Sequence, residues 1–273
     1  MTNKIIAVQG NNLNNLNPLT DTSIFLAKSG ENRGYKIFYY EPENLSIKNK
    51  KVFANGSFIK IDYSKIKFFK IIKKTNIDLS KVKFILVRQD PPFNLEYIST
   101  TYILDTIKNK VRVINNPTSI RNVSEKLYSM KFINFMPDTI FTKKVEDILY
   151  FYKKYKKIIL KPIHSYSGND IIYVNNKLNK KLILKFIKKH GHIMCQKFLP
   201  KIKFGDKRVF IINGKICGCI SRVPKAGSIL SNMSKGAKPK LIKLTKKEIK
   251  ISKIIAKDLV KEDIYFAGIH FID

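Results

Sequence analysis

The first part of this chain is constrained most by short apolar runs that end at turn residues. Between these runs, apolar residues recur with the spacing of a helix. Four such runs lie in the first 115 residues: Ile5 to Val8, Lys36 to Tyr40, Phe84 to Val87 and Val111 to Ile114. The residues from Ile24 predict a helix that ends before Gly34, and helical spacing predicts another over Ile98 to Ile107. Buried strands that alternate with helices predict an α/β fold with a doubly wound, mostly parallel sheet.

One turn signal in this part is strong. Asn55-Gly56 is the dipeptide that type I′ turns favour, so we expect a polar hairpin around it.

The pattern changes at about Thr118. The expected strands now lie closer together: Thr139 to Thr142, Lys157 to Lys161, Ile171 to Val174, His192 to Phe198, Arg208 to Ile212 and Lys215 to Arg222. The expected helices are fewer: Val145 to Tyr155, Lys181 to His190 and Lys246 to Val260. This is an antiparallel α+β pattern, so we place a domain boundary near residue 120, with domains over 1–120 and 121–273.

Charge suggests one class of function that the rest of the sequence does not favour. Lys and Arg number 53 against 20 Asp and Glu, a net charge of +33, which makes nucleic acid the first partner to test. However, only six of these residues are arginines, and the lysines are spread over the whole chain. Proteins that recognise phosphates and base edges usually do so with arginine, so we expect no specific nucleic-acid partner.

Cysteine usage and hydropathy indicate the cellular compartment in which we expect this protein. Three cysteines do not make a disulfide framework, no apolar run approaches the length of a membrane span, and the start lacks a signal-peptide pattern. We expect a soluble cytoplasmic protein with no membrane partner; an assembly of identical chains is compatible with the sequence. Cys217 and Cys219 are expected on the same face of a strand, as a small apolar pair in a core.

Standard signatures are absent: there is no phosphate-binding Gly-x-x-x-x-Gly-Lys loop, no Gly-x-Gly-x-x-Gly and no zinc spacing among the four histidines. Three other blocks carry chemistry. In the first, Arg88 follows a buried strand and precedes Asp90-Pro91-Pro92, at the strand end where open α/β sheets bind ligands. An arginine there can clamp a substrate carboxylate with two hydrogen bonds.

The second block is an apolar strand that ends in Lys161-Pro162, followed by the small polar loop Ser165 to Asp170. A partly solvated lysine at a strand end is stabilised by an anion, and the loop can present backbone N–H groups to phosphates. The third block runs from Gln196 and Lys197 to Pro200, and then through Asp206 and Arg208 to Arg222. Its first part can act as a hinge that pairs with an adenine edge while Phe198 and Leu199 pack against the ring.

Together and in this order, the blocks resemble the ATP-grasp ligases, specifically the bacterial glutathione synthetases. The resemblance runs along nearly the whole chain. It is carried by these segments: Val87 to Phe93, Tyr102 to Leu104, Asn115 to Leu127, Leu160 to Pro162, Gln196, Leu199-Pro200, Gly205 to Arg208, Arg222 to Pro224, Asn232 and Gly268. It implies an ATP-grasp domain after the N-terminal domain.

The resemblance also implies roles for single residues. Lys126 and Lys161 hold the nucleotide phosphates, Gln196, Lys197, Phe198 and Leu199 line the adenine site, and Asp206 takes a nucleotide or metal-linked role. Arg208 and Arg222 neutralise phosphoryl charge during catalysis, and Arg88 and Asn232 bind the substrate. The implied reaction uses ATP and Mg²⁺ to join γ-glutamylcysteine and glycine through an acyl phosphate.

Two departures from the family pattern concern the phosphates and the metal. The phosphate loop, Ser165 to Asn169, has a single glycine, Gly168. His270 stands where the family places a magnesium-binding aspartate, which leaves Asp273 as the one carboxylate of that stretch. The sequence as printed stops at Asp273, so we expect the remaining metal ligands, a Glu and an Asn, beyond that end, and poor catalysis without them.

Three alternatives stay open. The chain can be an ATP-grasp ligase for another acid and amine, a degenerate ATP-grasp module without catalysis, or a basic nucleic-acid-binding protein. The last differs from a ligase in where cations matter: many surface lysines and a steep salt dependence, rather than a few motif positions.

Overall fold

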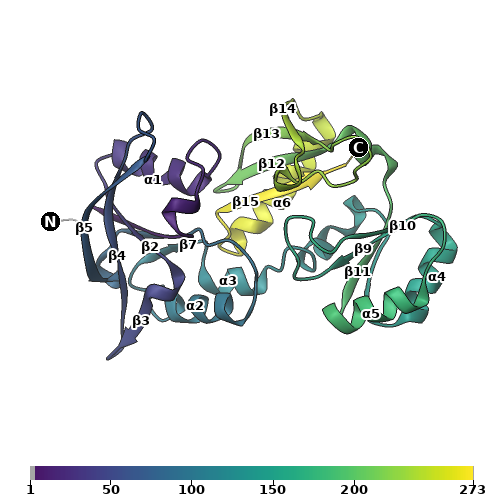
Figure 1. The fold of residues 1–273 in the computed structure, drawn as a ribbon, viewed down its shortest axis with the longest axis horizontal. Coiled ribbons are helices and arrows are strands. Elements are labelled where there is room, and N and C mark those ends of the chain that lie inside the picture. The colour runs from purple at the N-terminus through teal and green to yellow at the C-terminus, as the bar shows by residue number, and fades with distance from the viewer. Residues whose placement is uncertain (1–3, 273) are drawn as a thin grey trace. The chain divides into compact units, whose positions relative to one another are not determined.

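The structure is a computed structural model, and it describes residues 4–272. The chain divides into two compact units between Asn122 and Val123. Both units contain sheets covered by helices, so the α/β class expected from the sequence is confirmed (Figure 1).

A seven-stranded sheet forms the first unit. Its strands are β1 (Ile5–Gln9), β2 (Lys36–Tyr40), β3 (Leu45–Lys48), β4 (Lys51–Ile61), β5 (Phe69–Asp78), β6 (Phe84–Val87) and β7 (Arg112–Ile114). Strands β2, β1, β6 and β7 are parallel neighbours, as expected. Strands β3, β4 and β5 extend this core as antiparallel hairpins, in the order β3-β4-β2-β1-β6-β7 with β5 on β4.

Helices cover both faces of this sheet. Its helical segments are α1 (Thr22–Asn32), α2 (Leu95–Asp105), α3 (Pro117–Asn122), η1 (Leu13–Asn15), η2 (Pro42–Asn44) and η3 (Leu79–Lys81). On one face, Ile24 and Ala27 of α1 pack with Val8 and Ile37; on the other, Leu104 of α2 packs with residues of β2 and β6. The Asp21 carboxylate caps α1 by accepting from the amides of Ser23 and Ile24, at 2.7 and 3.0 Å.

The hairpin expected at Asn55-Gly56 is wrong. Both residues lie inside the long strand β4, and the tight turn lies at Asn49 and Lys50, whose φ angles are 48° and 61°. Positive φ at both central positions is the requirement of a type I′ turn, which Asn49 tolerates well. Gly56 serves another purpose, because a Cβ there would lie 2.8 Å from Phe38 Cζ and closer still to the Tyr39 carbonyl oxygen.

Two four-stranded sheets form the second unit. The first has the order β10-β9-β11-β8, from β8 (Thr139–Thr142), β9 (Ile158–Pro162), β10 (Ile172–Val174) and β11 (Ile193–Lys197). The second has the order β14-β13-β12-β15, from β12 (Asp206–Ile212), β13 (Lys215–Val223), β14 (Lys238–Leu241) and β15 (Phe266–Phe271). Neighbouring strands are antiparallel throughout, as the α+β pattern predicts.

Each of these sheets has helices on one face. The helical segments of this unit are η4 (Tyr128–Phe135), α4 (Val145–Tyr155), α5 (Lys180–His190), η5 (Pro200–Phe204), η6 (Met233–Lys235) and α6 (Lys246–Lys261). Helices α4 and α5 bury Ile148 and Ile183 against Leu160 and Cys195 of the first sheet. Helix α6 packs Ala256 against Val209 and Ile211 of the second. On the first sheet, the opposite face carries Ile159 and Met194 together with the polar Lys161 and Gln196.

A β-bulge corrects the expectation for the two cysteines. The register between β12 and β13 shifts between Phe210 and Ile211, so Cys217 is an extra residue on its strand. Cys219 packs against the core under α6, whereas Cys217 is exposed. The two thiols therefore do not share a face.

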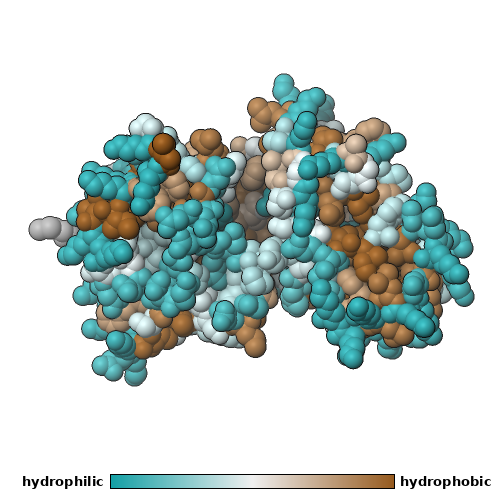
Figure 2. Space-filling view, viewed as in Figure 1, coloured by the Kyte–Doolittle hydropathy of each residue, from teal (hydrophilic) through white to brown (hydrophobic). Residues whose placement is uncertain are grey.

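Lysines cover the surface rather than forming one stripe. Figure 2 shows hydrophilic residues spread over the visible face of both units. Strand β5, which pairs with β4 alone among the described strands, carries exposed Lys70, Lys73 and Lys74 next to the exposed side chains of Ile71 and Ile72. Within residues 4–272, no helix has the length and apolar character needed to cross a membrane.

The close approach at Gly56 yields a test of the corrected strand assignment. We expect Gly56→Ala to lower the free energy of unfolding by about 1–3 kcal/mol, because the new methyl meets the backbone of β2 and has no room to relax. Gly218→Ala is the matched control: Gly218 also lies in a strand, and a Cβ there meets nothing within 4 Å. Urea titrations of both variants measure the difference, and equal stabilities would contradict the packing described here.

Candidate active site

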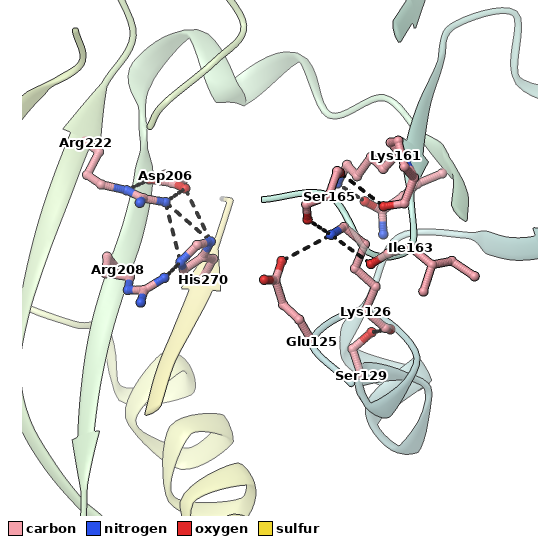
Figure 3. Close-up of polar contacts among 12 residues, drawn as sticks. Glu125, Lys126, Ser129, Lys161, Ile163, Ser165, Asp206, Arg208, Arg222 and His270 are labelled. Carbon is pink, nitrogen blue, oxygen red and sulfur yellow. Dashed lines mark hydrogen bonds and ion pairs between the residues drawn. The ribbon is translucent and has the colours of Figure 1, made fainter. Parts of the chain in front are cut away.

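Cross-strand register assembles one polar cluster on the second sheet of residues 123–272. Asp206 and Arg208 are two apart on β12 and share a face, opposite the face that Val209 packs against α6. Arg222 of β13 pairs with Asp206, and His270 of β15 pairs with Arg208. We call Asp206, Arg208, Arg222 and His270 the arginine cluster (Figure 3).

A buried ion pair holds this cluster. Arg222 Nε donates to Asp206 Oδ1 at 2.8 Å, and Arg222 Nη2 donates to Asp206 Oδ2. The two side chains are only 9% and 6% exposed. Both oxygens of Asp206 are therefore engaged by the guanidinium, in the two-pronged geometry that arginine and carboxylate favour.

His270 lies between two guanidinium groups. Its Nε2 contacts Arg208 Nη1, and its Nδ1 lies 3.3 Å from Arg222 Nη2. Burial lowers the pKa of His270 well below its usual value, and the charges of Arg208, Arg222 and Lys161 lower that pKa further. The imidazole is therefore neutral at physiological pH and adds no further positive charge. Arg208 packs over Gly268, where any Cβ would meet the guanidinium.

A second cluster, the lysine cluster, contains Lys126, Lys161 and Gln196. Lys161 lies at the end of β9, on the face opposite α4 and α5, and its Nζ donates to Gln196 Oε1 at 2.9 Å. Gln196 in turn donates to Thr139 Oγ1 at 2.9 Å, which fixes the orientation of its amide. Burial, and then the neighbouring Lys126 charge, lower the pKa of Lys161 to about 8. The Lys161 ammonium is thus partly desolvated, as the strand-end pattern predicted.

Lys126 anchors the loop that follows β9. Its Nζ donates to the carbonyl oxygens of Ser165 and Ile163, at 2.6 and 3.2 Å, and the side chain is 11% exposed. Within the loop, Ser167, Gly168 and Asp170 all have positive φ angles, of 53°, 73° and 55°. A Cβ on Gly168 would lie 2.6 Å from Asn232 Oδ1, so the single glycine of the loop is where Asn232 comes close.

Neighbouring residues of the expected adenine hinge, Lys197 and Phe198, contact different parts of the chain. The amides of Lys197 and Phe198 donate to the carbonyls of Asp138 and Lys157, at 2.9 and 3.0 Å. The Lys197 ammonium lies 5.5 Å from the Tyr155 ring centroid, and the Phe198 ring stacks on Tyr173 with centroids 4.3 Å apart. Among the described residues, the Leu199 amide has no such acceptor, so within the hinge it is the donor that a ligand edge can use.

The two clusters face each other, as Figure 3 shows. The charge of Lys161 is among those that lower the pKa of His270, so the clusters lie within electrostatic reach. Two groups of cations that point into one space suit a ligand with several negative charges, such as a polyphosphate.

Magnesium is a poorer fit to the described residues. Residues 4–272 contain no group of three or more His, Cys, Asp or Glu side chains that could hold a metal ion. Asp206 is occupied by Arg222, His270 offers nitrogen where Mg²⁺ prefers oxygen, and Asp273 lies outside the described residues.

Arg88 lies in the first unit. Its Nε donates to Ser23 Oγ at 3.4 Å, and Asp21 and Asp90 are the nearest acidic groups. Burial lowers the pKa of Arg88 below its usual value, and both carboxylates oppose that shift. The site lies at the carboxyl end of β6, where the strand-end argument expected a ligand.

Several site contacts were not predicted from the sequence. Thr139, which orients Gln196, and Ser165, whose carbonyl holds Lys126, carry no pattern of their own. For Thr139 the signal is strand pairing, because it stands opposite Gln196 in the β8–β11 ladder.

The ion pair in the arginine cluster gives the next testable expectation. Arg222→Met leaves the Asp206 carboxylate buried without its partner, so we expect the free energy of unfolding to fall by about 3–5 kcal/mol. Adding Asp206→Leu should recover most of that loss, because an apolar pair carries no desolvation penalty.

Lys189→Met is the control for this experiment. It removes a 3.0 Å ion pair with Asp170 whose side chains are 63% and 44% exposed, and such surface pairs contribute about 0–1 kcal/mol. Denaturant titration compares the three variants, and an Arg222→Met loss as small as that of Lys189→Met would contradict the buried pair.

Comparison with known proteins gives the two units separate matches. The prokaryotic glutathione synthetase N-terminal domain matches residues 5–121, and the prokaryotic glutathione synthetase ATP-grasp domain matches residues 125–273. Among solved structures, a D-cycloserine synthetase superposes with a TM-score of 0.63 at 10% identity, covering 96% of this chain and 83% of its own. The D-alanyl-alanine synthetase A of Vibrio cholerae superposes with a TM-score of 0.59 at 13% identity, covering 99% and 85%. These structures establish the ATP-grasp fold.

Relatives found by sequence have a higher identity to this chain than these solved structures have. The glutathione synthetase of Mesorhizobium japonicum is 32% identical over 272 residues, which is 98% of this chain and 86% of the relative. That of Buchnera aphidicola from Acyrthosiphon pisum is 32% identical and covers 98% and 85%. With both domains matched in order along the chain, this protein belongs to the prokaryotic glutathione synthetase family.

Proposed function

We propose that this chain ligates γ-glutamylcysteine to glycine at the expense of ATP, the activity of the family to which it belongs. The observation that carries the proposal is the pair of facing cation clusters, one of which contains the partly desolvated Lys161. A cation whose pKa has fallen to about 8 gains most from a bound anion. This favours nucleotide phosphates over a passive surface role.

ATP would lie between the two sheets of residues 123–272. Lys161 would contact the phosphates directly, while Lys126 would hold the Ser165–Asp170 loop in the shape that presents its backbone to them. Leu199 would offer its amide to the adenine edge, with Phe198 held in place by Tyr173. Gln196 would orient Lys161 rather than bind the base.

The reaction then has two steps. The cysteinyl carboxylate of γ-glutamylcysteine attacks the γ-phosphorus of ATP; the bond to ADP breaks and an acyl phosphate forms. The amine of glycine attacks the acyl carbon, phosphate leaves with the bonding pair, and the new amide nitrogen loses a proton. Charge neutralisation and positioning supply most of the catalysis in such transfers.

The arginines would divide this work. Arg208 is partly exposed, so it would meet the transferred phosphoryl group, whereas Arg222 is buried on Asp206 and would act by holding the cluster in place. Asn232, beside Gly168, would close the phosphate loop from the other side. Mg²⁺ remains an expectation from the family resemblance.

In the first unit, Arg88 would bind a carboxylate of γ-glutamylcysteine. Support comes from its place at the carboxyl end of β6 and from its burial. Glycine as the amine rests on the family alone.

Lys161→Met tests the nucleotide site. We expect the variant to lose ATP affinity by at least tenfold and to lose turnover, because the direct phosphate cation is gone, while the unfolding transition stays intact. Lys157→Met is the control, since Lys157 is exposed and lies four residues earlier in the chain. Calorimetric titration with ATP compares them, and equal affinities would exclude Lys161 from the site.

The pH dependence of ATP binding is a second readout of the same prediction. The free Lys161 ammonium loses its proton as pH rises through about 8, and phosphates bind the protonated form. Affinity should therefore fall above that pH, with proton uptake on binding, and Lys161→Met should remove this component of the profile. A wild-type profile flat from pH 7 to 9 would contradict it.

Arg88→Lys tests the acid site. Lysine keeps the charge but loses the planar fork, so we expect the KM for γ-glutamylcysteine to rise about tenfold or more, from a contact of roughly 1.5–3 kcal/mol. The KM for ATP should stay within twofold. Steady-state kinetics with each substrate varied in turn measures both, and an unchanged acid KM would place the substrate elsewhere.

A further inference from the structure

Four polar side chains are buried together in the first unit, and one of them follows Arg88 in the chain. They are Gln9, Tyr40, Gln89 and Thr100, with exposures of 0%, 2%, 9% and 8%. They come from the ends of β1 and β2, from the residue after Arg88, and from α2. We call them the glutamine network. Gln89 lies in the Val87 to Phe93 segment, and the proposed reaction uses none of the four.

Hydrogen bonds connect all four. Gln9 Nε2 donates to Gln89 Oε1, and Tyr40 OH donates to Gln9 Oε1 at 3.1 Å. Gln89 Nε2 donates to Thr100 Oγ1 at 3.2 Å, and Thr100 Oγ1 donates to the Tyr97 carbonyl at 2.8 Å. The network therefore runs without a break from β2 through β1 to the segment after β6 and on to α2.

The segment that carries Arg88 is tied to the β1 side at three successive residues. The Arg88 amide donates to the Gln9 carbonyl at 2.7 Å, and Gln89 joins the network. Asp90 exchanges two hydrogen bonds with the Asn11 side chain, at 3.1 and 2.7 Å. Asn11 is itself held by Tyr39, whose hydroxyl donates to the Asn11 carbonyl at 2.6 Å.

Stability alone does not account for burying these groups. Replacing both partners of a buried hydrogen bond by apolar groups of similar shape is often neutral or stabilising, whereas a polar network admits few arrangements. A leucine at position 89 could occupy several rotamers; a glutamine that is hydrogen-bonded to both Gln9 and Thr100 is held in one. The directionality of the network therefore fixes the backbone on either side of residue 89.

We propose that the glutamine network is a positioning device that sets Arg88 in the geometry needed to bind the acid substrate. This inference rests on the proposed role of Arg88. The four residues do not touch the substrate; they act through the backbone of residues 88–90. Their effect should be on recognition of γ-glutamylcysteine and not on ATP, whose proposed contacts all lie in the other unit.

Two neighbouring threonines of α2 give a matched test. Thr100 and Thr101 are both buried, and each donates to a carbonyl one turn earlier, Tyr97 and Ile98 respectively. Only Thr100 contacts Gln89; Thr101 instead accepts from Arg121. We expect Thr100→Val to raise the KM for γ-glutamylcysteine several-fold with the KM for ATP unchanged, and Thr101→Val to leave both unchanged.

A fully apolar network separates positioning from stability. We expect the triple variant Gln9→Leu/Tyr40→Phe/Gln89→Leu to keep a melting temperature near or above that of the wild type, because no buried polar group of the network is left unpaired. Its acid KM should rise roughly five- to tenfold, of the order of one lost hydrogen bond's contribution.

The outcomes discriminate between explanations. Acid KM values that rise equally for Thr100→Val and Thr101→Val, or a triple variant with a wild-type acid KM, would overturn the inference while leaving Arg88 in place. A neutral Arg88→Lys variant would overturn the Arg88 assignment and this inference together. When Arg88→Lys is added to the triple variant, the acid KM should rise by less than the product of the two separate increases, since both changes act on one contact. Full additivity would count against a positioning role.

Discussion

The concentration of positive charge in a partly buried space is the constraint on which the second unit depends. Three of its cations have a neutralising or polar partner: Arg222 has Asp206, Lys126 has two carbonyl oxygens, and Lys161 has the Gln196 amide oxygen. Burial, and then the remaining surplus of positive charge, lower the pKa values of Lys161 and His270. Burying like charges together is unfavourable unless an anion arrives. The ligand-free site is therefore destabilised by repulsion between its cations, and binding of an anion relieves this repulsion.

The two units handle polar burial in contrasting ways. In the second unit, charge is buried and the register of antiparallel strands decides which groups meet, as with Asp206 opposite Arg222. In the first unit, the glutamine network buries neutral amides and hydroxyls, and they are satisfied among themselves. A charged site favours binding of an anion, whereas a neutral, fully bonded network holds a shape.

Much of the fold could be predicted, and the failures have physical causes. Runs such as Lys36 to Tyr40 and Phe84 to Val87 were correct to the residue, because short apolar segments between turn residues have few other solutions. Asn55-Gly56 was misread as a turn because the signal is local, whereas the fit of Gly56 against β2 depends on a partner strand. Strands β3 and β5 were missed since their lysines and isoleucines give no clear alternation. For the site, the residue types could be predicted, and their roles remain predictions. Which of them meet depends on register, as the β-bulge that separates Cys217 from Cys219 illustrates.

The lysines of β5 have a consequence for how the molecule behaves in a crowded solution. An open strand edge offers unpaired backbone groups to any other strand, and the exposed Ile71 and Ile72 would stabilise such pairing through apolar contacts. Lys70, Lys73 and Lys74 on the same strand bring charge repulsion against a second copy of that edge. Part of the +33 net charge, which identifies no partner, can thus be understood as protection against unwanted partners, and its effect would weaken as ionic strength rises.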